Sequence, residues 1–307
     1  MRPRASPRQS ATGAGRSAVP VTLRDALWPG ADFFTPWRDR GGRLSALRIA
    51  VIALLLAPAL YFAASVAIDG FGPEPLKETT QFTGRWALRI LLLSLAVSPA
   101  GKLLAWSRLL QLRRMIGLGA VFWVLAHFAL YVLDQQGMIG KIASEIALRF
   151  YLTIGFAAVL GLLVLAVTSS DAWVRGLGRG WKRLHRLVFP IAVLAVLHAV
   201  IQAKSNASEP LMMAGLLAWL LGWRLLPLPA GLRLWALAGL SLAAGAATAG
   251  LEFLWYDNFT RLPAARIFAA NLDLALAPRP AAQVVLIALA FITLVALRRL
   301  AASRPQA

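Results

Sequence analysis

Long apolar runs recur along the whole chain, and they constrain its fold more than any other feature. A run of about 20 predominantly apolar residues spans a bilayer as a helix, because a helix satisfies its own backbone hydrogen bonds where water is absent. Eight stretches qualify to different degrees: 46–68, 86–100, 115–133, 150–168, 187–201, 211–226, 234–250 and 281–297. The second and fifth are short, and we expect them to extend into flanking arginine-bearing turns whose side chains snorkel. Because 59% of residues are hydrophobic, we predict an all-α integral membrane protein, a bundle of transmembrane helices.

The net charge of +19 is distributed unevenly between the loops that join these runs. The N-terminal segment up to Arg48 and the loops 101–114, 169–186, 222–233 and 298–307 carry 23 Lys or Arg and 4 Asp or Glu. The loops 69–85, 134–149, 202–210 and 251–280 carry 8 and 9. Cytoplasmic loops of membrane proteins are enriched in Lys and Arg, so this asymmetry predicts an even number of spans with both termini in the cytoplasm. The basicity therefore indicates topology and not nucleic-acid binding.

Regions outside the spans contain little that indicates a separate domain. Residues 1–44 are basic and rich in Ser, Pro, Gly and Ala, and we expect a disordered cytoplasmic tail. The outer loop 251–280 is expected to be either an interfacial helix or a packed connection. No internal repeat is apparent. Cysteine is absent, which excludes disulfides, Cys-ligated iron–sulfur clusters and thiolate-ligated haem.

The chain has three histidines, and all of them fall in or beside predicted spans. His127 lies about six residues from the outer end of the third span, and His198 lies near the outer end of the fifth, so the two are expected at matching depth. Two histidines at one depth on different helices are what a haem iron with two protein ligands requires. The alternative is that each histidine forms a hydrogen bond between helices. His185 begins the fifth span on the inner side.

The stretch HRLVFPIAVLAVLH, from His185 to His198, has a spacing of 13 residues. Helical steps of about 100° leave residues 13 apart with a mismatch of about 140°. Pro190 removes the hydrogen bond to the carbonyl of Arg186, so a kink or a π-bulge is expected to recover part of the rotation.

Two arginine pairs lie near these histidines in the predicted topology. Arg113 and Arg114 are 14 and 13 residues before His127, opposite His185, where they are either a clamp for a phosphate or carboxylate group or ordinary topology anchors. Arg85 and Arg89 are one turn apart at the outer start of the second span. They either receive haem propionates or simply snorkel.

Three segments carry a resemblance to a known family. TGRWALRILLLSLAVSP, LRRMIGLGAVFWVLAHFALYV and WKRLHRLVFPIAVLAVLH resemble the MsrQ (YedZ) family of the wider ferric-reductase-like transmembrane group. The resemblance covers about residues 45–226 and implies a six-span haem-binding domain. Residues 227–307, with two further spans and the outer loop 251–280, exceed that six-span core.

The resemblance also implies a function. MsrQ proteins are haem-binding subunits of the bacterial inner membrane that bind haem b and FMN. They pass electrons from the quinone pool, or from a cytosolic flavin reductase, to MsrP, a periplasmic molybdopterin subunit that reduces methionine sulfoxide. His127 and His198 would be the axial ligands of the outer haem iron, His185 the family's third histidine and a further candidate ligand, and Arg113 and Arg114 the family's arginine turn. The chain itself would be an electron-transfer subunit.

Two other functions are compatible with parts of the pattern. A transporter would use the histidines and arginines as proton or anion relays, but the predicted spans contain few acidic residues. A stand-alone ferric reductase or quinol-oxidising b-type cytochrome would share the same electron path and differ only in its terminal acceptor.

Overall fold

A computed structural model describes residues 35–303 apart from 39–41, 204–205, 228, 230–231 and 274–276. Most of the predicted tail, 1–44, therefore lies outside the described residues. The described part is helical and contains no strand. Its principal helices are α3 (Ala46–Asp69), α4 (Pro75–Leu103), α5 (Arg113–Asp134), α6 (Ile139–Leu148), α7 (Phe150–Val167), α9 (Arg179–His185), α10 (Val188–Gln202), α11 (Ser208–Leu225), α13 (Leu234–Phe259) and α15 (Pro280–Ala302). Shorter elements are η1 (Ser107–Leu112), α8 (Asp171–Leu177) and α14 (Ala264–Ala269).

Seven helical segments in the described part are long and apolar enough to cross a membrane, which confirms an all-α membrane protein. They correspond to α3, α4, η1 with α5, α7, α9 with α10, α13 and α15. The predicted short spans are longer in the structure, since α4 alone has 29 residues. The remaining expected span, α11, is not among the seven; it carries Glu209 in its first turn and Arg224 in its last. Eight spans, divided as six and two, therefore stay a prediction.

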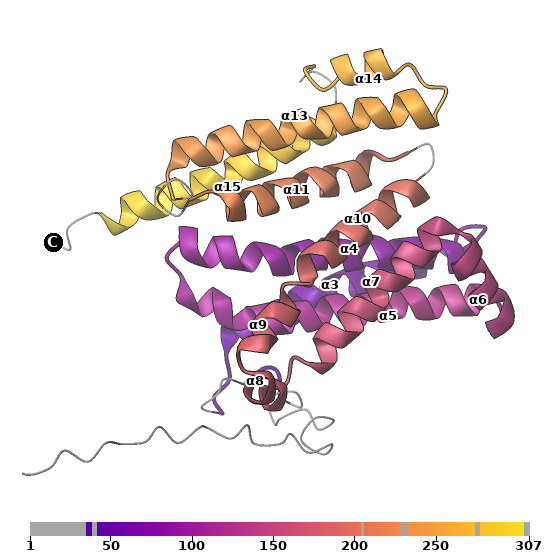
Figure 1. Cartoon of the computed structure of the whole chain (residues 1–307), viewed down its shortest axis with the longest axis horizontal. Coiled ribbons are helices and arrows are strands. Elements are labelled where there is room, and N and C mark those ends of the chain that lie inside the picture. Colours follow the sequence, from indigo (N-terminus) through magenta and orange to yellow (C-terminus); the bar gives the residue numbers. More distant parts are fainter. Residues whose placement is uncertain are drawn as a thin grey trace, which may run out of the picture.

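The helices pack in antiparallel pairs (Figure 1). α4 packs along α5, α7 along α10, and α13 along α15. α11 contacts α4 and α10 on one side and α13 and α15 on the other, so it joins the first two pairs to the third. α3 lies at the edge, where Trp123 of α5 donates a hydrogen bond of 3.1 Å to the carbonyl of Leu55. Most side chains of α3 are exposed, as expected for a helix that faces lipid.

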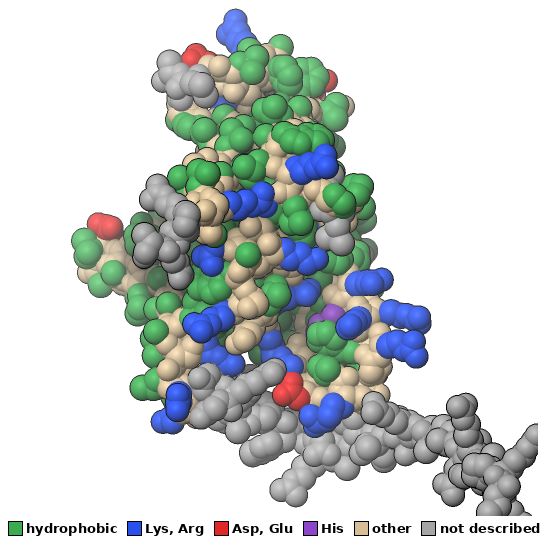
Figure 2. All heavy atoms as spheres, turned by 90° about the vertical axis from the view of Figure 1, so that its left-hand side faces the viewer, with side chains coloured by type: hydrophobic (Ala, Val, Ile, Leu, Met, Phe, Trp, Pro, Cys, Tyr) green, Lys and Arg blue, Asp and Glu red, His purple; other side chains and the backbone are tan. Residues whose placement is uncertain are grey.

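The loops predicted to be cytoplasmic gather at one end of the bundle. This end holds η1, α8 and α9 together with the C-terminal end of α15 (Figure 1). Seen from that end, Lys and Arg side chains are numerous and Asp and Glu side chains are few (Figure 2). Arg298 of α15 lies over the Trp106 ring at 5.4 Å, which ties the C-terminal helix to the loop between α4 and α5. The uneven distribution of Lys and Arg along the sequence thus makes one end of the folded bundle basic.

The helix that carries two of the histidines is interrupted between them. α9 ends at His185 and α10 begins at Val188. The backbone N–H of Phe189 donates to the Arg186 carbonyl, which Pro190 leaves without its usual helical partner. The N–H groups of Arg186 and Leu187 also bond three residues back, so the break is a 3₁₀-type turn and not a π-bulge. Such a turn advances about 120° per residue instead of about 100°, which reduces the predicted rotational mismatch.

The C-terminal pair differs from the sequence prediction in one respect. α13 continues to Phe259, nine residues beyond the predicted end of its span, so Glu252 belongs to a helix and is fully buried. Between Phe259 and Pro280, the described residues of the expected outer loop form the short helix α14, which packs on α13. Phe268 of α14 meets Phe253 of α13 edge-on at 6.0 Å. The described part of this loop is therefore a packed connection.

Candidate functional site

His127 and His198 come together although they are 71 residues apart. His127 lies on α5 and His198 on α10, and their ring centroids are 6.5 Å apart with an angle of 71° between the ring planes. Both rings are partly buried between helices. The depth match expected from the sequence thus places the two imidazoles beside each other.

Each of these imidazoles is held by a backbone carbonyl. Nδ1 of His127 lies 2.8 Å from the carbonyl oxygen of Thr80, and Nδ1 of His198 lies 2.8 Å from that of Tyr151. A carbonyl oxygen only accepts, so Nδ1 must carry the proton and Nε2 of the neutral ring keeps its lone pair. In the described part of the chain, neither Nε2 has a hydrogen-bond partner. This is how metal-binding histidines are usually oriented.

The distance between the rings fits one metal ion. A bond between a first-row metal and an imidazole nitrogen is about 2.0–2.1 Å long, and that nitrogen lies about 1 Å from the ring centroid, so two rings on opposite sides of one iron have centroids roughly 6–6.5 Å apart. The observed 6.5 Å falls at the upper end of this range. The donor set, two neutral imidazoles and no thiolate, is compatible with a haem iron that has two protein ligands.

The two helix pairs build their halves of this site in the same way. Each histidine bonds a carbonyl 47 residues earlier and lies against a glycine 43 residues earlier, so every element of one half recurs 71 residues later. The corresponding residues are Thr80 and Tyr151, Gly84 and Gly155, and His127 and His198. The expectation that the chain has no internal repeat is wrong at this structural level. The side chains outside the site differ between the halves, which explains why the sequence does not display the repeat.

His185 lies at the inner end and has different partners. Its Nε2 is 3.2 Å from the hydroxyl of Thr168, and its ring stacks on Trp181 with centroids 4.1 Å apart. Trp181 in turn donates a hydrogen bond of 2.8 Å to the Thr168 carbonyl. The position equivalent to His185 in the first half is occupied by Arg114. The inner end therefore has one imidazole where the outer end has two.

Arg113 and Arg114, predicted opposite His185, begin α5 at the same end of the bundle at which α9 ends at His185. Arg114 is paired at 2.5 Å with Asp171, the first residue of α8. The side chains of this pair are 40% and 55% exposed, so the pair lies in water-accessible space. Arg113 is also exposed.

Arg85 and Arg89 reach the same carboxylate. The Glu209 side chain at the start of α11 lies 2.6 Å from Arg89 and 3.9 Å from Arg85. Arg89 also lies over the Trp86 ring at 4.6 Å. Both arginines therefore connect α4 to α11 at the outer end of the bundle.

Comparison with known proteins supports a family assignment. Residues 83–196 match the model of the family described as "Ferric reductase like transmembrane component", a range that includes His127 and His185. A protein of Xanthomonas axonopodis pv. citri is 47% identical over 157 residues, which cover 51% of this chain and 72% of the relative. One of Rhodospirillum rubrum is 45% identical over 192 residues, or 62% and 90%. Both are named "Protein-methionine-sulfoxide reductase heme-binding subunit MsrQ".

This chain belongs to the MsrQ family. No solved structure matches it. The matched parts cover 51% and 62% of this chain, so the chain is longer than the part it shares with these MsrQ relatives.

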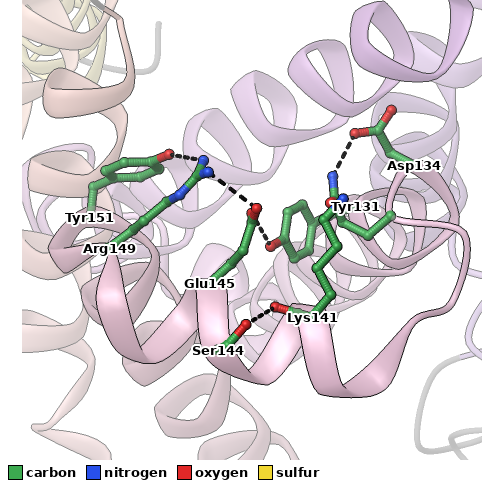
Figure 3. A network of polar contacts seen from close by, with 8 residues as sticks. Tyr131, Asp134, Lys141, Ser144, Glu145, Arg149 and Tyr151 are labelled. Carbon is green, nitrogen blue, oxygen red and sulfur yellow. Dashed lines mark hydrogen bonds and ion pairs between the residues drawn. The ribbon is translucent and has the colours of Figure 1, made fainter.

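Figure 3 shows a polar network of this MsrQ chain that includes Tyr151, whose ring centroid lies 6.4 Å from that of His198. Glu145 of α6 accepts from Arg149 at 3.1 Å, and Arg149 donates to the Tyr151 hydroxyl at 3.3 Å. Tyr131, one turn after His127, donates to the same carboxylate at 3.5 Å. The hydrogen bond to Tyr151, followed by the charge of Glu145, raises the pKa of Arg149 above its ordinary value. The network fixes α6 against the start of α7, where the carbonyl that holds His198 is located.

The groups that hold the two histidines were not predicted from the sequence. The carbonyls of Thr80 and Tyr151 carry no side-chain signal, because every residue has a carbonyl. Gly84 and Gly155 are visible in the sequence, but apolar spans contain many glycines. Only the equal spacing of glycine and histidine in the two halves would have indicated them.

Proposed function

We propose that this chain is the haem b subunit of a membrane electron-transfer system, with His127 and His198 as the axial ligands of one haem iron. The observation that carries the proposal is the pair of imidazoles 6.5 Å apart, each with Nδ1 held by a carbonyl. The printed names of the relatives support it, since they describe heme-binding subunits. Bound haem supplies a one-electron redox centre there. The two carbonyls fix the ring tautomers. With both histidines bound to the iron, no coordination position would remain for a substrate.

We further propose that electrons pass through this chain to an MsrP-like periplasmic molybdopterin subunit, with which it would form a heterodimer for the repair of methionine sulfoxide. The donor would be the quinone pool or a cytosolic flavin reductase. The relatives' names refer to a methionine-sulfoxide reductase, which supports this destination. The basic end seen in Figure 2 supports a location in the bacterial inner membrane with both termini in the cytoplasm, because the chain ends of the described part lie on that side. Substrate reduction then occurs in the partner.

Roles for the remaining site residues are part of the same proposal. His185 and the exposed Arg113 and Arg114 form the cytoplasmic entry of electrons, where two guanidinium groups suit the phosphate of FMN. For Arg114 this requires exchange of its present partner Asp171, a water-accessible pair that contributes little stability. Arg85 and Arg89 lie at the outer end, where haem propionates need positive partners.

Optical spectra of the purified protein test the haem assignment. In detergent and supplied with haem, the wild type is expected to show a low-spin b-type spectrum in reduced-minus-oxidised difference. His127→Ala and His198→Ala should lose that spectrum, because each removes one iron ligand. His185→Ala is the matched control and should keep it. A wild-type protein without bound haem would contradict the proposal.

A stand-alone transmembrane ferric reductase is the second candidate, favoured by the family model that matches residues 83–196. The two functions differ in the acceptor of the electrons. Reduced protein in vesicles should be reoxidised by an MsrP-type subunit under the first function and by ferric chelates, with no added subunit, under the second.

A further inference from the structure

Gly84 and Gly155 lie directly against the two outer histidine rings. A Cβ atom at Gly155 would be 2.7 Å from Nδ1 and 2.9 Å from Cε1 of His198. At Gly84, it would be 2.9 Å from both Cε1 and Nδ1 of His127. Real Cβ atoms essentially never come closer than 3.0 Å to another heavy atom, so any side chain at these positions would displace the ring.

The ring cannot move away without a loss. Gly84 follows Thr80 by four residues and Gly155 follows Tyr151 by four, so each glycine is one helical turn beyond the carbonyl that holds the ring. In an α-helix that carbonyl accepts from the N–H of the glycine as well as from the imidazole, and the Thr80 carbonyl also lies 2.9 Å from the Thr83 hydroxyl. Each imidazole ring therefore packs against one helical turn, which begins at the carbonyl that holds the ring and ends at a glycine without a side chain. A methyl group on this turn would lengthen the 2.8 Å bond to the carbonyl.

We propose that Gly84 and Gly155 are positioning residues of the haem site, which set the coordination and the reduction potential of the iron through the two imidazoles. The inference rests on the proposed haem function. A hydrogen bond from Nδ1 to an acceptor makes Nε2 a more basic ligand, which favours ferric iron. Loss of that bond weakens the ligand and raises the potential. The occurrence of the same unit in both halves, 71 residues apart, shows that the arrangement is not an accident of one helix crossing.

Ordinary packing is the competing explanation, since glycines allow close approach of membrane helices in general. The chain contains a control for it in the same helix pair. A Cβ atom at Gly161 of α7 would lie 2.7 Å from Ile191 of α10, a contact as short as that at Gly155 but with an aliphatic side chain. Gly161→Ala thus strains the α7–α10 contact without touching a histidine. Gly117 of α5 has nothing within 4 Å of its Cβ position and serves as a second control.

The experiment compares four alanine variants, each purified with haem, by optical and electron paramagnetic resonance spectra and by redox titration. We expect Gly155→Ala to lose low-spin character, to show a raised midpoint potential, and to lose haem affinity by about ten- to a hundred-fold. Gly84→Ala should change in the same direction but less, because its contact is longer. Gly161→Ala and Gly117→Ala should keep the wild-type spectrum and midpoint potential. This holds for Gly161→Ala even if the strained contact with Ile191 lowers its melting temperature.

The outcomes separate the two levels of the proposal. A wild type that holds no haem refutes the haem site and this inference with it. A wild type that holds haem, together with glycine variants of unchanged spectrum and potential, refutes the inference alone. An equal shift in Gly161→Ala assigns the effect to packing and also refutes it. If Gly155→Ala does not fold, Gly84→Ala decides, because its milder contact is opposite the other histidine.

Discussion

Replacement of Arg279 by Gln is expected to destabilise the C-terminal helix pair far more than replacement of its partner. Glu252 on α13 has no exposed surface, and its carboxylate lies 2.5 Å from Arg279 and 2.6 Å from the side-chain amide of Asn271. Arg279 is 25% exposed and precedes α15 directly. Arg279→Gln leaves a fully buried carboxylate with one neutral partner, a change that costs about 3–5 kcal/mol.

Replacement of Glu252 by Gln removes the buried negative charge and leaves Arg279 without its carboxylate partner. In Glu252→Gln the amide oxygen still accepts from Asn271, and the partly exposed guanidinium of Arg279 reaches water. We expect a loss of about 1–2 kcal/mol, typical of a weakened buried hydrogen bond. In the double variant no buried charge remains, so its loss should be smaller than that of Arg279→Gln alone. The two sites are in contact, and their effects should therefore be strongly non-additive.

Thermal or denaturant unfolding of the detergent-purified protein, followed by tryptophan fluorescence, measures these differences. Trypsin cleavage at the outer connection reports local opening of the same region. Arg266→Gln is the matched control, because Arg266 is an exposed arginine of α14 and should change stability by no more than about 0.5 kcal/mol. If Glu252→Gln costs as much as Arg279→Gln, or if the two losses simply add, the argument from a buried charge is refuted.

Two further predictions concern the inner end. His185→Ala should keep the low-spin spectrum but slow haem reduction from the cytoplasmic side, because it removes the only inner imidazole. Stopped-flow spectroscopy measures the rate of haem reduction. An unchanged rate would mean that His185 has only a packing role. Arg113→Gln combined with Arg114→Gln should lower FMN occupancy several-fold, since both positive charges are lost, whereas Arg175→Gln on the same side serves as control. If the double variant and the Arg175→Gln control bind equal amounts of FMN, Arg113 and Arg114 act only as topology anchors.

The sequence correctly predicted seven apolar helices and the basic character of one end of the bundle, because both depend on local composition. Whether a segment crosses a bilayer depends on its own length and apolar character, and the preferred side of a loop depends on its own Lys and Arg content. Segment 150–168 was placed within one residue of α7. In α13, by contrast, Glu252 at the predicted loop boundary hid the continuation of the helix to Phe259. A carboxylate indicates a loop unless its partner is known, and Arg279 is 27 residues away.

The contents of the site were only partly predictable. His127 and His198 were indicated because imidazole is rare in apolar spans and because depth follows from residue number. Which way each ring faces depends on the rotation of its helix, and this in turn depends on contacts with other helices. Hence the carbonyls of Thr80 and Tyr151, and the pairing of Glu209 with Arg85 and Arg89, appear only in the folded chain.

The amino-acid sequence is sufficient to show that this chain is a helical membrane protein, which of its loops are basic, and which two histidines share a depth. Only helix packing brings the ring centroids of these histidines to 6.5 Å, places a glycine against each ring, and pairs a buried carboxylate with Arg279 at the start of α15. The physical reason is the same in each case. A helix satisfies its backbone and its hydrophobicity alone, so these properties can be read along the chain. Polar side chains in a membrane need partners from other helices, and the packing of the helices chooses those partners.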